Sequence, residues 1–184
     1  MRRSEMRIFF AISIPETCQR RIAAARKDIK LNAMPRWVPA ENYHLTLHFI
    51  DDTTPAEAEK LKAHATAVAT KVPAFTCVVG GWGCFPNSRR PRVLYADIHK
   101  GREEIITLSR LLQVGGGKQQ EQLTPHLTVA RSGESATVEL SRQATLLAEF
   151  TVDRFVLYAS ELTPTGARYT VLEDYALAGI AKSE

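Results

Sequence analysis

Two copies of one short pattern could carry chemistry in this chain. The first places Thr46 two residues after His44 and the second places Thr128 two residues after His126, so each has the form His-x-Thr-x. Side chains two residues apart in a strand share a face, so each imidazole would lie beside a hydroxyl. Both groups can engage a phosphate, and an imidazole also transfers protons near neutral pH. The two pairs together predict a site for phosphate chemistry.

The neighbours of these polar residues are mostly apolar. Leu45, Leu47 and Phe49 would share the opposite face of the first strand, and we expect them to anchor it in a core. By the same alternation His48 would add a third imidazole to the polar face, and its role is open.

A single His-x-Thr tetrapeptide is more often a half-buried strand edge than an active site. Here the surroundings repeat as well, because Phe-Thr at 75–76 follows the first copy as Phe-Thr at 150–151 follows the second. A spacing of about 80 residues indicates an internal duplication. The duplication would relate the two motif strands by a pseudo-two-fold axis.

The rest of the chain shows strand and helix patterns. A β-rich run at 7–14 precedes a helix that starts after Pro15, and Arg26 on the polar side of that helix is expected to be solvated. Thr54 opens a capping box with proline at the first helical position, which predicts a second helix. Further helices are expected at 102–114 and 136–148, and strands at 75–79, 150–162 and 168–177.

This order of elements predicts an α+β protein of two pseudo-symmetric lobes. Each lobe would be an antiparallel sheet with helices on its outer face, and the active-site cleft would lie between them. We expect one domain over 1–184, with lobes at roughly 1–90 and 91–184, and 45 % hydrophobic residues suffice for its core.

Charge and cysteine content bear on the binding partner and the cellular compartment of the protein. A net charge of +4 permits a nucleic-acid partner without requiring one. Cys18, Cys77 and Cys84 form no C-x-x-C spacing, which argues against a disulfide framework and a zinc ribbon. We expect a cytoplasmic protein, and no stretch is long enough to span a membrane.

The two motifs and their surroundings resemble the 2H phosphoesterase family, which is named for its paired His-x-Thr/Ser-x motifs. The chain most resembles the RNA 2′,3′-cyclic phosphodiesterases of that family, long called 2′-5′ RNA ligases. The resemblance covers nearly the whole chain, and His48 departs from it, since a small or apolar residue is expected there. It rests on residues 7–11, 38–39, 42–47, 92–95, 125–128, 131, 157–160 and 168–169.

The resemblance implies an enzyme that hydrolyses RNA 2′,3′-cyclic phosphate ends to 2′-phosphates without metal or cofactor. It implies His44 as the proton donor to the leaving 3′ oxygen and His126 as the proton acceptor from water. Thr46 and Thr128 could donate hydrogen bonds to phosphate oxygens. Arg131 is implied as a phosphate ligand, although strict alternation from His126 would direct it to the opposite face, so that a strand end or bulge must turn it inward.

The residues themselves explain why two histidines suit this reaction but leave their roles open. Opening a cyclic phosphodiester needs a proton acceptor on the attacking side and a donor on the leaving side. Imidazoles with a pKa of about 6.5 can supply one neutral and one protonated group. Nothing in residue type or spacing decides which histidine is the acid.

Several other functions stay open at this point. Within the enzymes they are ligation of 2′-5′ RNA ends and hydrolysis of a small cyclic nucleotide. In another class is a non-catalytic module that binds RNA ends. The presence of both histidines and both threonines argues against it, because binding alone would not need a titrating pair. A metal site is disfavoured, because His44 and His48 on one strand would stand about 13 Å apart and could not share an ion.

The segment 80–91 brings aromatic and basic residues together. Phe85, Arg89 and Arg90 are candidate RNA contacts, by base stacking and by phosphate binding, with Trp82 nearby. The segment could equally be a solvated hinge between the lobes. The expected partner is RNA with a 2′,3′-cyclic phosphate end, tRNA fragments included, bound by a monomer with no metal and no membrane.

Overall fold

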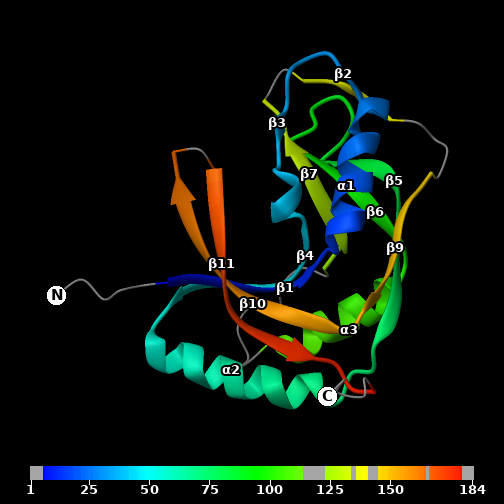
Figure 1. Ribbon diagram of the computed structural model, residues 1–184. Coiled ribbons are helices and arrows are strands. Elements are labelled where there is room, and N and C mark those ends of the chain that lie inside the picture. Colours follow the sequence, from blue (N-terminus) through cyan, green and yellow to red (C-terminus); the bar gives the residue numbers. More distant parts are fainter. Residues whose placement is uncertain (1–5, 114–122, 134–135, 141–144, 165, 180–184) are drawn as a thin grey trace.

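The computed structural model describes residues 6–113, 123–133, 136–140, 145–164 and 166–179. Nine of their strands form one curled antiparallel sheet, which makes a half-barrel (Figure 1). The strands of the main sheet, in the order in which they lie, are β11 (Gly166–Ala176), β10 (Arg154–Thr163), β1 (Met6–Ser13), β4 (His44–Thr53), β7 (His126–Arg131), β6 (Val93–Lys100), β5 (Phe75–Phe85) and β9 (Leu146–Val152), with β3 (Arg36–Trp37) also paired to β7.

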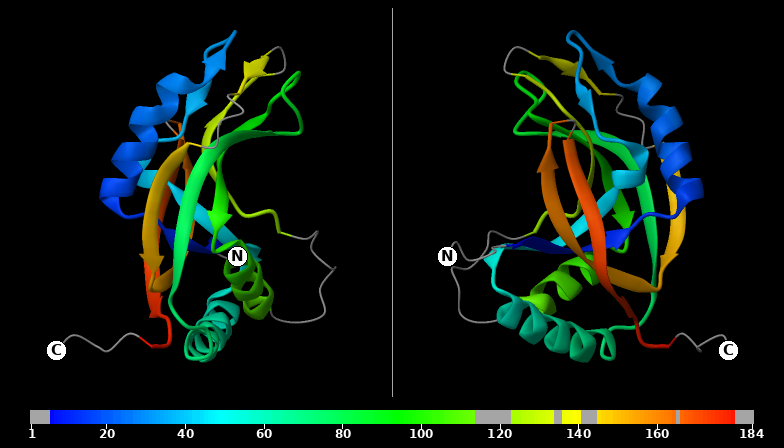
Figure 2. Two further views of the ribbon diagram at one scale, coloured as in Figure 1. Left: turned by 90° about the vertical axis from the view of Figure 1, so that its right-hand side faces the viewer. Right: turned by 60° about the vertical axis from the view of Figure 1, so that its left-hand side comes forward.

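Three α-helices pack against this sheet. α1 (Glu16–Ala24) lies along β9, α3 (Arg102–Leu112) packs on β4, and α2 (Pro55–Ala69) contacts α3 and β11. Figure 2 shows α2 and α3 together at one end of the sheet and α1 apart from them. The remaining short elements are η1 (Ala25–Asp28), η2 (Ala40–Asn42) and a two-stranded sheet of β2 (Lys30–Leu31) and β8 (Val138–Glu139).

The main sheet has an approximate two-fold arrangement about its centre. The motif strands β4 and β7 are neighbours, joined through the pair Leu45–Leu127, and are flanked by β1 and β6 and then by β10 and β5. The predicted α+β class with two similar lobes is confirmed. β5 lies beside β6, however, while β10 lies beside β1 and β11 beside β10, so each side of the sheet takes strands from both halves of the sequence.

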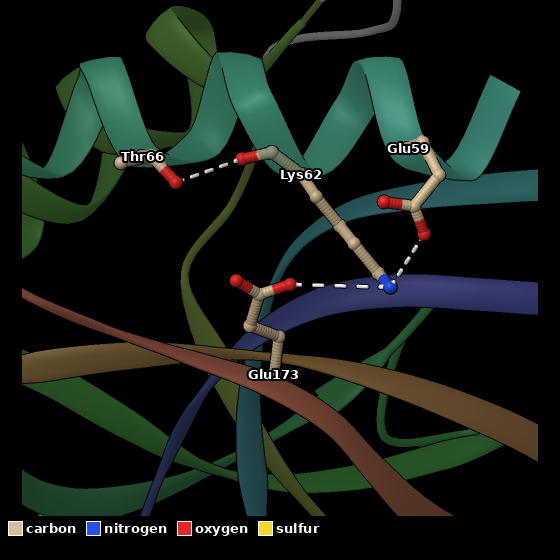
Figure 3. A network of polar contacts seen from close by, with 4 residues as sticks. All are labelled: Glu59, Lys62, Thr66 and Glu173. Atoms are coloured by element: carbon tan, nitrogen blue, oxygen red, sulfur yellow. Dashed lines mark hydrogen bonds and ion pairs between the residues drawn. The ribbon is translucent and has the colours of Figure 1, made fainter. Parts of the chain in front are cut away.

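The predicted capping box starts α2. The Thr54 hydroxyl accepts from the Glu57 amide at 3.3 Å, and a Glu57 carboxylate oxygen accepts from the Thr54 amide at 2.9 Å. Figure 3 shows how α2 is then tied to β11: the Lys62 ammonium lies 2.8 Å from a Glu59 carboxylate oxygen and 4.0 Å from one of Glu173. The same view shows the Thr66 hydroxyl donating to the Lys62 carbonyl at 3.0 Å.

β4 contains a bulge directly after its motif threonine. Thr46 pairs with Ala11 and His48 pairs with Phe10, so Leu47 is an extra residue on β4. A bulge of this kind shifts the alternation of side chains by one. Cross-strand partners share a face, so His48 lies on the side of the fully buried Phe10 and away from the face of Thr46.

β7 contains the same bulge at the equivalent place. Thr128 pairs with Tyr95 and Ala130 pairs with Leu94, so Val129 is the extra residue. Val129 and Ala130 are consecutive and both fully buried, as expected where alternation is interrupted. Each His-x-Thr motif therefore ends in a bulge.

The two bulges redirect the residues that follow. Phe49 pairs with Phe9 on the face that carries His44, and it is 50 % exposed; the prediction that it shares a buried face with Leu45 and Leu47 is wrong. The prediction that His48 adds a third imidazole to that face is wrong for the same reason. On β7 the bulge brings Arg131 back to the face of Thr128. We call the face that carries both motif histidines the motif face.

Both bulge carbonyls are held by groups outside the main neighbouring strands. The Ser109 hydroxyl of α3 donates to the Leu47 carbonyl at 2.6 Å, and the Val38 amide donates to the Val129 carbonyl at 2.9 Å. Ser109 is one of two buried polar residues in the described part of the chain. Its hydrogen bond satisfies a carbonyl in the core.

Arg26 is not the solvated residue that the helical pattern predicted. Its Nε donates to the Tyr43 hydroxyl at 2.5 Å and its Nη2 to the Val38 carbonyl at 2.8 Å. The guanidinium also lies 5.1 Å from the Trp37 ring centre and 5.0 Å from that of Tyr43. Arg26 thereby fastens η1, which directly follows α1, to the segment that enters the motif strand β4.

Two predictions for the late chain need correction. The helix expected at 136–148 is wrong, because its described residues include β8 and the start of β9; residues 141–144 lie outside the described part. β-branched Thr137 and Val138 fit the extended pairing with β2, where the Asn32 side chain accepts from the Thr137 amide at 2.7 Å. The strand expected at 150–162 is two strands, β9 and β10, which break at Asp153.

The three cysteines are free thiols, as predicted. Burial raises the pKa of Cys77 to about 12, which keeps its thiol protonated. Among the helices of the described residues, none has the length and apolar character needed to cross a bilayer.

Replacing Ser109 with Ala should lower the free energy of unfolding by about 1–3 kcal/mol, because the buried Leu47 carbonyl loses its donor. Urea denaturation measures the change. Thr70→Ala is the matched control, since the Thr70 hydroxyl donates to the Ala67 carbonyl at 2.9 Å at an exposed helix end. Equal effects of the two changes would contradict a special role for the bulge carbonyl.

Candidate active site

The motif histidines lie on adjacent strands. Leu45 pairs with Leu127, and an antiparallel register through this pair sets His44 opposite Thr128 and Thr46 opposite His126. All four polar side chains are partly exposed, while the leucines between them are fully buried. The structure thus groups the four predicted motif residues in two crossed pairs.

Each histidine is oriented by a backbone carbonyl two residues earlier. His44 Nδ1 lies 2.8 Å from the Asn42 carbonyl oxygen, and His126 Nδ1 lies 2.7 Å from that of Thr124. A carbonyl can only accept, so Nδ1 carries the proton and Nε2 is left for a substrate. Residue types do not reveal this contact, because any residue at 42 or 124 supplies a carbonyl.

Aromatic rings flank both imidazoles. His44 lies against Phe9 and Tyr169, with ring centres 5.1 and 5.2 Å away. His126 lies against Phe85 and Tyr95 at 5.1 and 5.4 Å. Phe9, Tyr95 and Tyr169 were missed as site residues, since a lone aromatic residue in a strand pattern is more often core.

The pKa of His44 is lowered from its ordinary value. Burial is the main cause, the hydrogen bond to the Asn42 carbonyl opposes it, and the positive charges of His126 and Arg131 lower the pKa further. The free protein therefore favours a neutral His44. An anion bound among these groups would act in the opposite direction.

Arg131 lies at the exposed end of β7 on the motif face. Its charge acts on His44 and also lowers the pKa of Tyr169, which burial on balance raises. His44 and Tyr169 belong to β4 and β11, so the arginine of one motif strand is near groups from the other side of the sheet. A guanidinium in this place can bind phosphate in two-pronged fashion.

The candidate RNA contacts separate in the structure. The Phe85 ring stacks on Tyr95 at 4.5 Å and is part of the His126 surroundings. Arg89 and Arg90 instead occupy the exposed turn between β5 and β6, where both amides donate to the Asn87 side-chain oxygen at 3.1 Å. Trp82 is partly buried against the core.

Other candidate ligands do not gather here. In the described ranges no group of three or more His, Cys, Asp or Glu residues is arranged to hold a metal ion. His64 lies on α2, where its Nε2 is 2.7 Å from the Leu111 carbonyl oxygen. The site is therefore built from two imidazoles, two hydroxyls, a guanidinium and aromatic rings.

Known proteins share this arrangement of elements. The family described as LigT like Phosphoesterase matches residues 12–95 and 100–169. A protein of Aquifex aeolicus named RNA 2′,3′-cyclic phosphodiesterase is 31 % identical, over 93 % of this chain and 95 % of that protein. The namesake of Thermus thermophilus is 30 % identical, over 95 % of this chain and 91 % of its own.

Solved structures agree with these sequence matches. The crystal structure of E. coli LigT complexed with 3′-AMP superposes with a TM-score of 0.75 and 27 % identity, covering 95 % of this chain and 99 % of that one. A crystal structure of a Thermus thermophilus protein superposes with a TM-score of 0.78 and 28 % identity, with the same coverage. The chain therefore belongs to the LigT-like phosphoesterases, and the 2H phosphoesterase family indicated by its two His-x-Thr motifs is confirmed.

Proposed function

We propose that the protein hydrolyses the 2′,3′-cyclic phosphate at the end of an RNA to a 2′-phosphomonoester by acid/base catalysis from two histidines, without a metal. The observation that carries the proposal is the matched pair of imidazoles, each with Nδ1 held by a carbonyl and Nε2 left for the substrate. Relatives named RNA 2′,3′-cyclic phosphodiesterase support the choice of substrate.

In the proposed reaction His126 Nε2 accepts a proton from water as the water oxygen bonds to phosphorus. The bond between phosphorus and the 3′ oxygen breaks, and His44 donates a proton to that oxygen. The product carries a 3′ hydroxyl and a 2′ phosphate. Water and leaving group must stand in line across phosphorus, and imidazoles on neighbouring strands related by a pseudo-two-fold axis suit that requirement.

Thr46, Thr128 and Arg131 would stabilise the phosphate. Each hydroxyl lies opposite a histidine of the other strand, so hydrogen-bond donors would face the non-bridging oxygens from both sides. Arg131 would add a fixed positive charge. Phe85 would pack beside the ribose or base near His126.

The lowered pKa of His44 bears on its role as acid. In the free protein His44 favours the neutral form, whereas donation requires the protonated form. The negative charge of a bound phosphodiester would raise the pKa of His44, since it favours the protonated imidazole and offsets the charge of Arg131. Binding of the substrate would thus favour the protonated form of His44 that proton donation requires.

The proposal also covers the setting of the enzyme. We place it in the cytoplasm as a monomer. Free thiols support the compartment, and one sheet that uses strands from both halves of the chain supports one domain over 1–184. RNA ends, including those of tRNA fragments, are the proposed partners. Ligation of 2′-5′ ends would use the same histidines in reversed roles, and turnover of a small cyclic nucleotide would need no RNA contacts.

His44→Ala and His126→Ala should each lower kcat on an RNA with a cyclic phosphate end by about 100- to 10,000-fold, because each removes one proton transfer. Both transfers serve one step, so the double variant should lose less than the product of the single losses. His64→Ala is the control and should keep nearly full activity. Near-normal activity in either motif variant would remove that histidine from the chemistry.

The pH dependence should separate the two roles. kcat/KM reports the free enzyme and kcat the complex, so if His44 is the acid the alkaline limb of kcat should lie at higher pH than that of kcat/KM. The sign follows because burial and cations lower the pKa of His44 in the free protein and bound phosphate raises it.

His44→Ala should lose the alkaline limb and His126→Ala the acidic limb, measured where residual activity allows. The opposite pairing would exchange acid and base while keeping the two-histidine mechanism. An alkaline limb of kcat at lower pH than that of kcat/KM would contradict the proposed effect of the phosphate.

A metal chelator should leave the rate unchanged, because imidazoles and donor groups suffice for a singly charged diester. Activity after treatment with EDTA and gel filtration is the measurement. A loss that zinc or magnesium restores would overturn the metal-free mechanism.

A further inference from the structure

A second arginine stands directly beside the predicted phosphate ligand. In the pairing of β3 with β7, Arg36 is the partner of Arg131 and Trp37 is the partner of Ala130. Cross-strand partners share a face, and Ala130 is fully buried while Trp37 packs against the core. Arg36 and Arg131, both exposed, therefore point to the motif face together.

The backbone fixes this pair of cations. The Val38 amide donates to the carbonyl of the bulge residue Val129 at 2.9 Å, which holds β3 against the motif strand. Arg26 clamps the same segment through the Val38 carbonyl and the Trp37 ring. Arg36 cannot easily leave its neighbour, because its strand is held on both sides.

Two like charges directly opposite each other in a sheet are unfavourable. In the part of the chain that the structure describes, neither Arg36 nor Arg131 has an acidic partner within 4.0 Å. Exposed Arg20 and Arg154, by contrast, do have ion pairs. An arginine pair with no carboxylate partner among the described residues is complementary to an anion with more than one charge.

The position of Arg36 indicates which anion the arginine pair binds. β3 and β4 follow one another along the same edge of β7, because β4 pairs at Leu127 and β3 pairs at Ala130 and Arg131. From His126 the motif face runs past Thr128 to Arg131. At that end β7 has two neighbours: Val93 of β6 pairs with Arg131 on one side, and Arg36 of β3 pairs with it on the other. Arg36 is therefore outside the two histidines.

We propose that Arg36 binds the internucleotide phosphate that precedes the terminal nucleotide, and so makes the site prefer an RNA end to a cyclic mononucleotide. The inference rests on the proposed function, in which Arg131 holds the reacting phosphate. An RNA end presents a second phosphate next to the first, and a second guanidinium fixed beside Arg131 meets it. A cyclic mononucleotide offers Arg36 nothing to bind.

The test compares two substrates, a dinucleotide ending in a 2′,3′-cyclic phosphate and the corresponding mononucleotide 2′,3′-cyclic phosphate. Arg36→Gln should lower kcat/KM for the dinucleotide about 10- to 100-fold, as expected for loss of a charge-assisted hydrogen bond, and leave the mononucleotide within about two-fold. Arg36→Lys should retain most of the preference. Arg20→Gln, which removes an exposed arginine on α1, should change neither substrate.

Salt dependence and stability give independent readouts. The slope of log kcat/KM against log salt for the dinucleotide should become shallower by about 0.7 in Arg36→Gln, as for one lost phosphate contact to a single strand. The melting temperature should stay the same or rise, because a like-charge pair is relieved.

Equal losses on both substrates would overturn the proposal, and so would no loss on either. If wild-type protein turned over neither substrate, the proposed function would fail instead. Calorimetric binding of a dinucleotide and a mononucleotide that each end in a 3′-phosphate would then decide the role of Arg36, whose replacement should weaken only the dinucleotide.

Discussion

A strand's two-residue period is the constraint on which this site depends. Strict alternation can set His126 and Thr128 on one face, but it would send Arg131 to the other. The bulge at Val129 resolves the conflict, because one extra residue reverses the alternation between the hydroxyl and the guanidinium. The equal bulge at Leu47 shows that the device belongs to both copies of the motif. Both bulge carbonyls have dedicated donors, so the interruption is stabilised rather than merely tolerated.

The same device has different results in the two copies. Phe49 and Arg131 occupy equivalent places, five residues after each histidine, yet one is an exposed aromatic ring stacked on Phe9 and the other a cation. In the proposed hydrolysis, two chemically identical ends would treat the attacking water and the leaving oxygen alike. An aromatic end and a basic end make the motif face directional, which suits a substrate whose chain continues on one side only.

Much of this could be predicted from the sequence, and the failures share a cause. The motifs, the capped helix at Thr54 and the α+β class depend on local patterns, which residue types reveal. A bulge adds one residue but has no characteristic residue types, so the strand faces predicted for Phe49 and His48 were wrong. The prediction that Arg26 is solvated was wrong because its ring and carbonyl partners come from a distant segment. The helix expected over 136–148 failed because pairing of β8 with β2 outweighed a weak helical pattern.

The exchange of strands between the two sides of the sheet has a consequence for how the chain is synthesised. β5 is made before β6 and β9, the strands that flank it, and β1 waits for β10, which is encoded about 150 residues later. A nascent chain that has completed its first motif still exposes both edges of that unfinished sheet. Neither side of the sheet is complete until strands from both halves of the sequence have been made, so each side depends on the other half of the chain for its pairing partners.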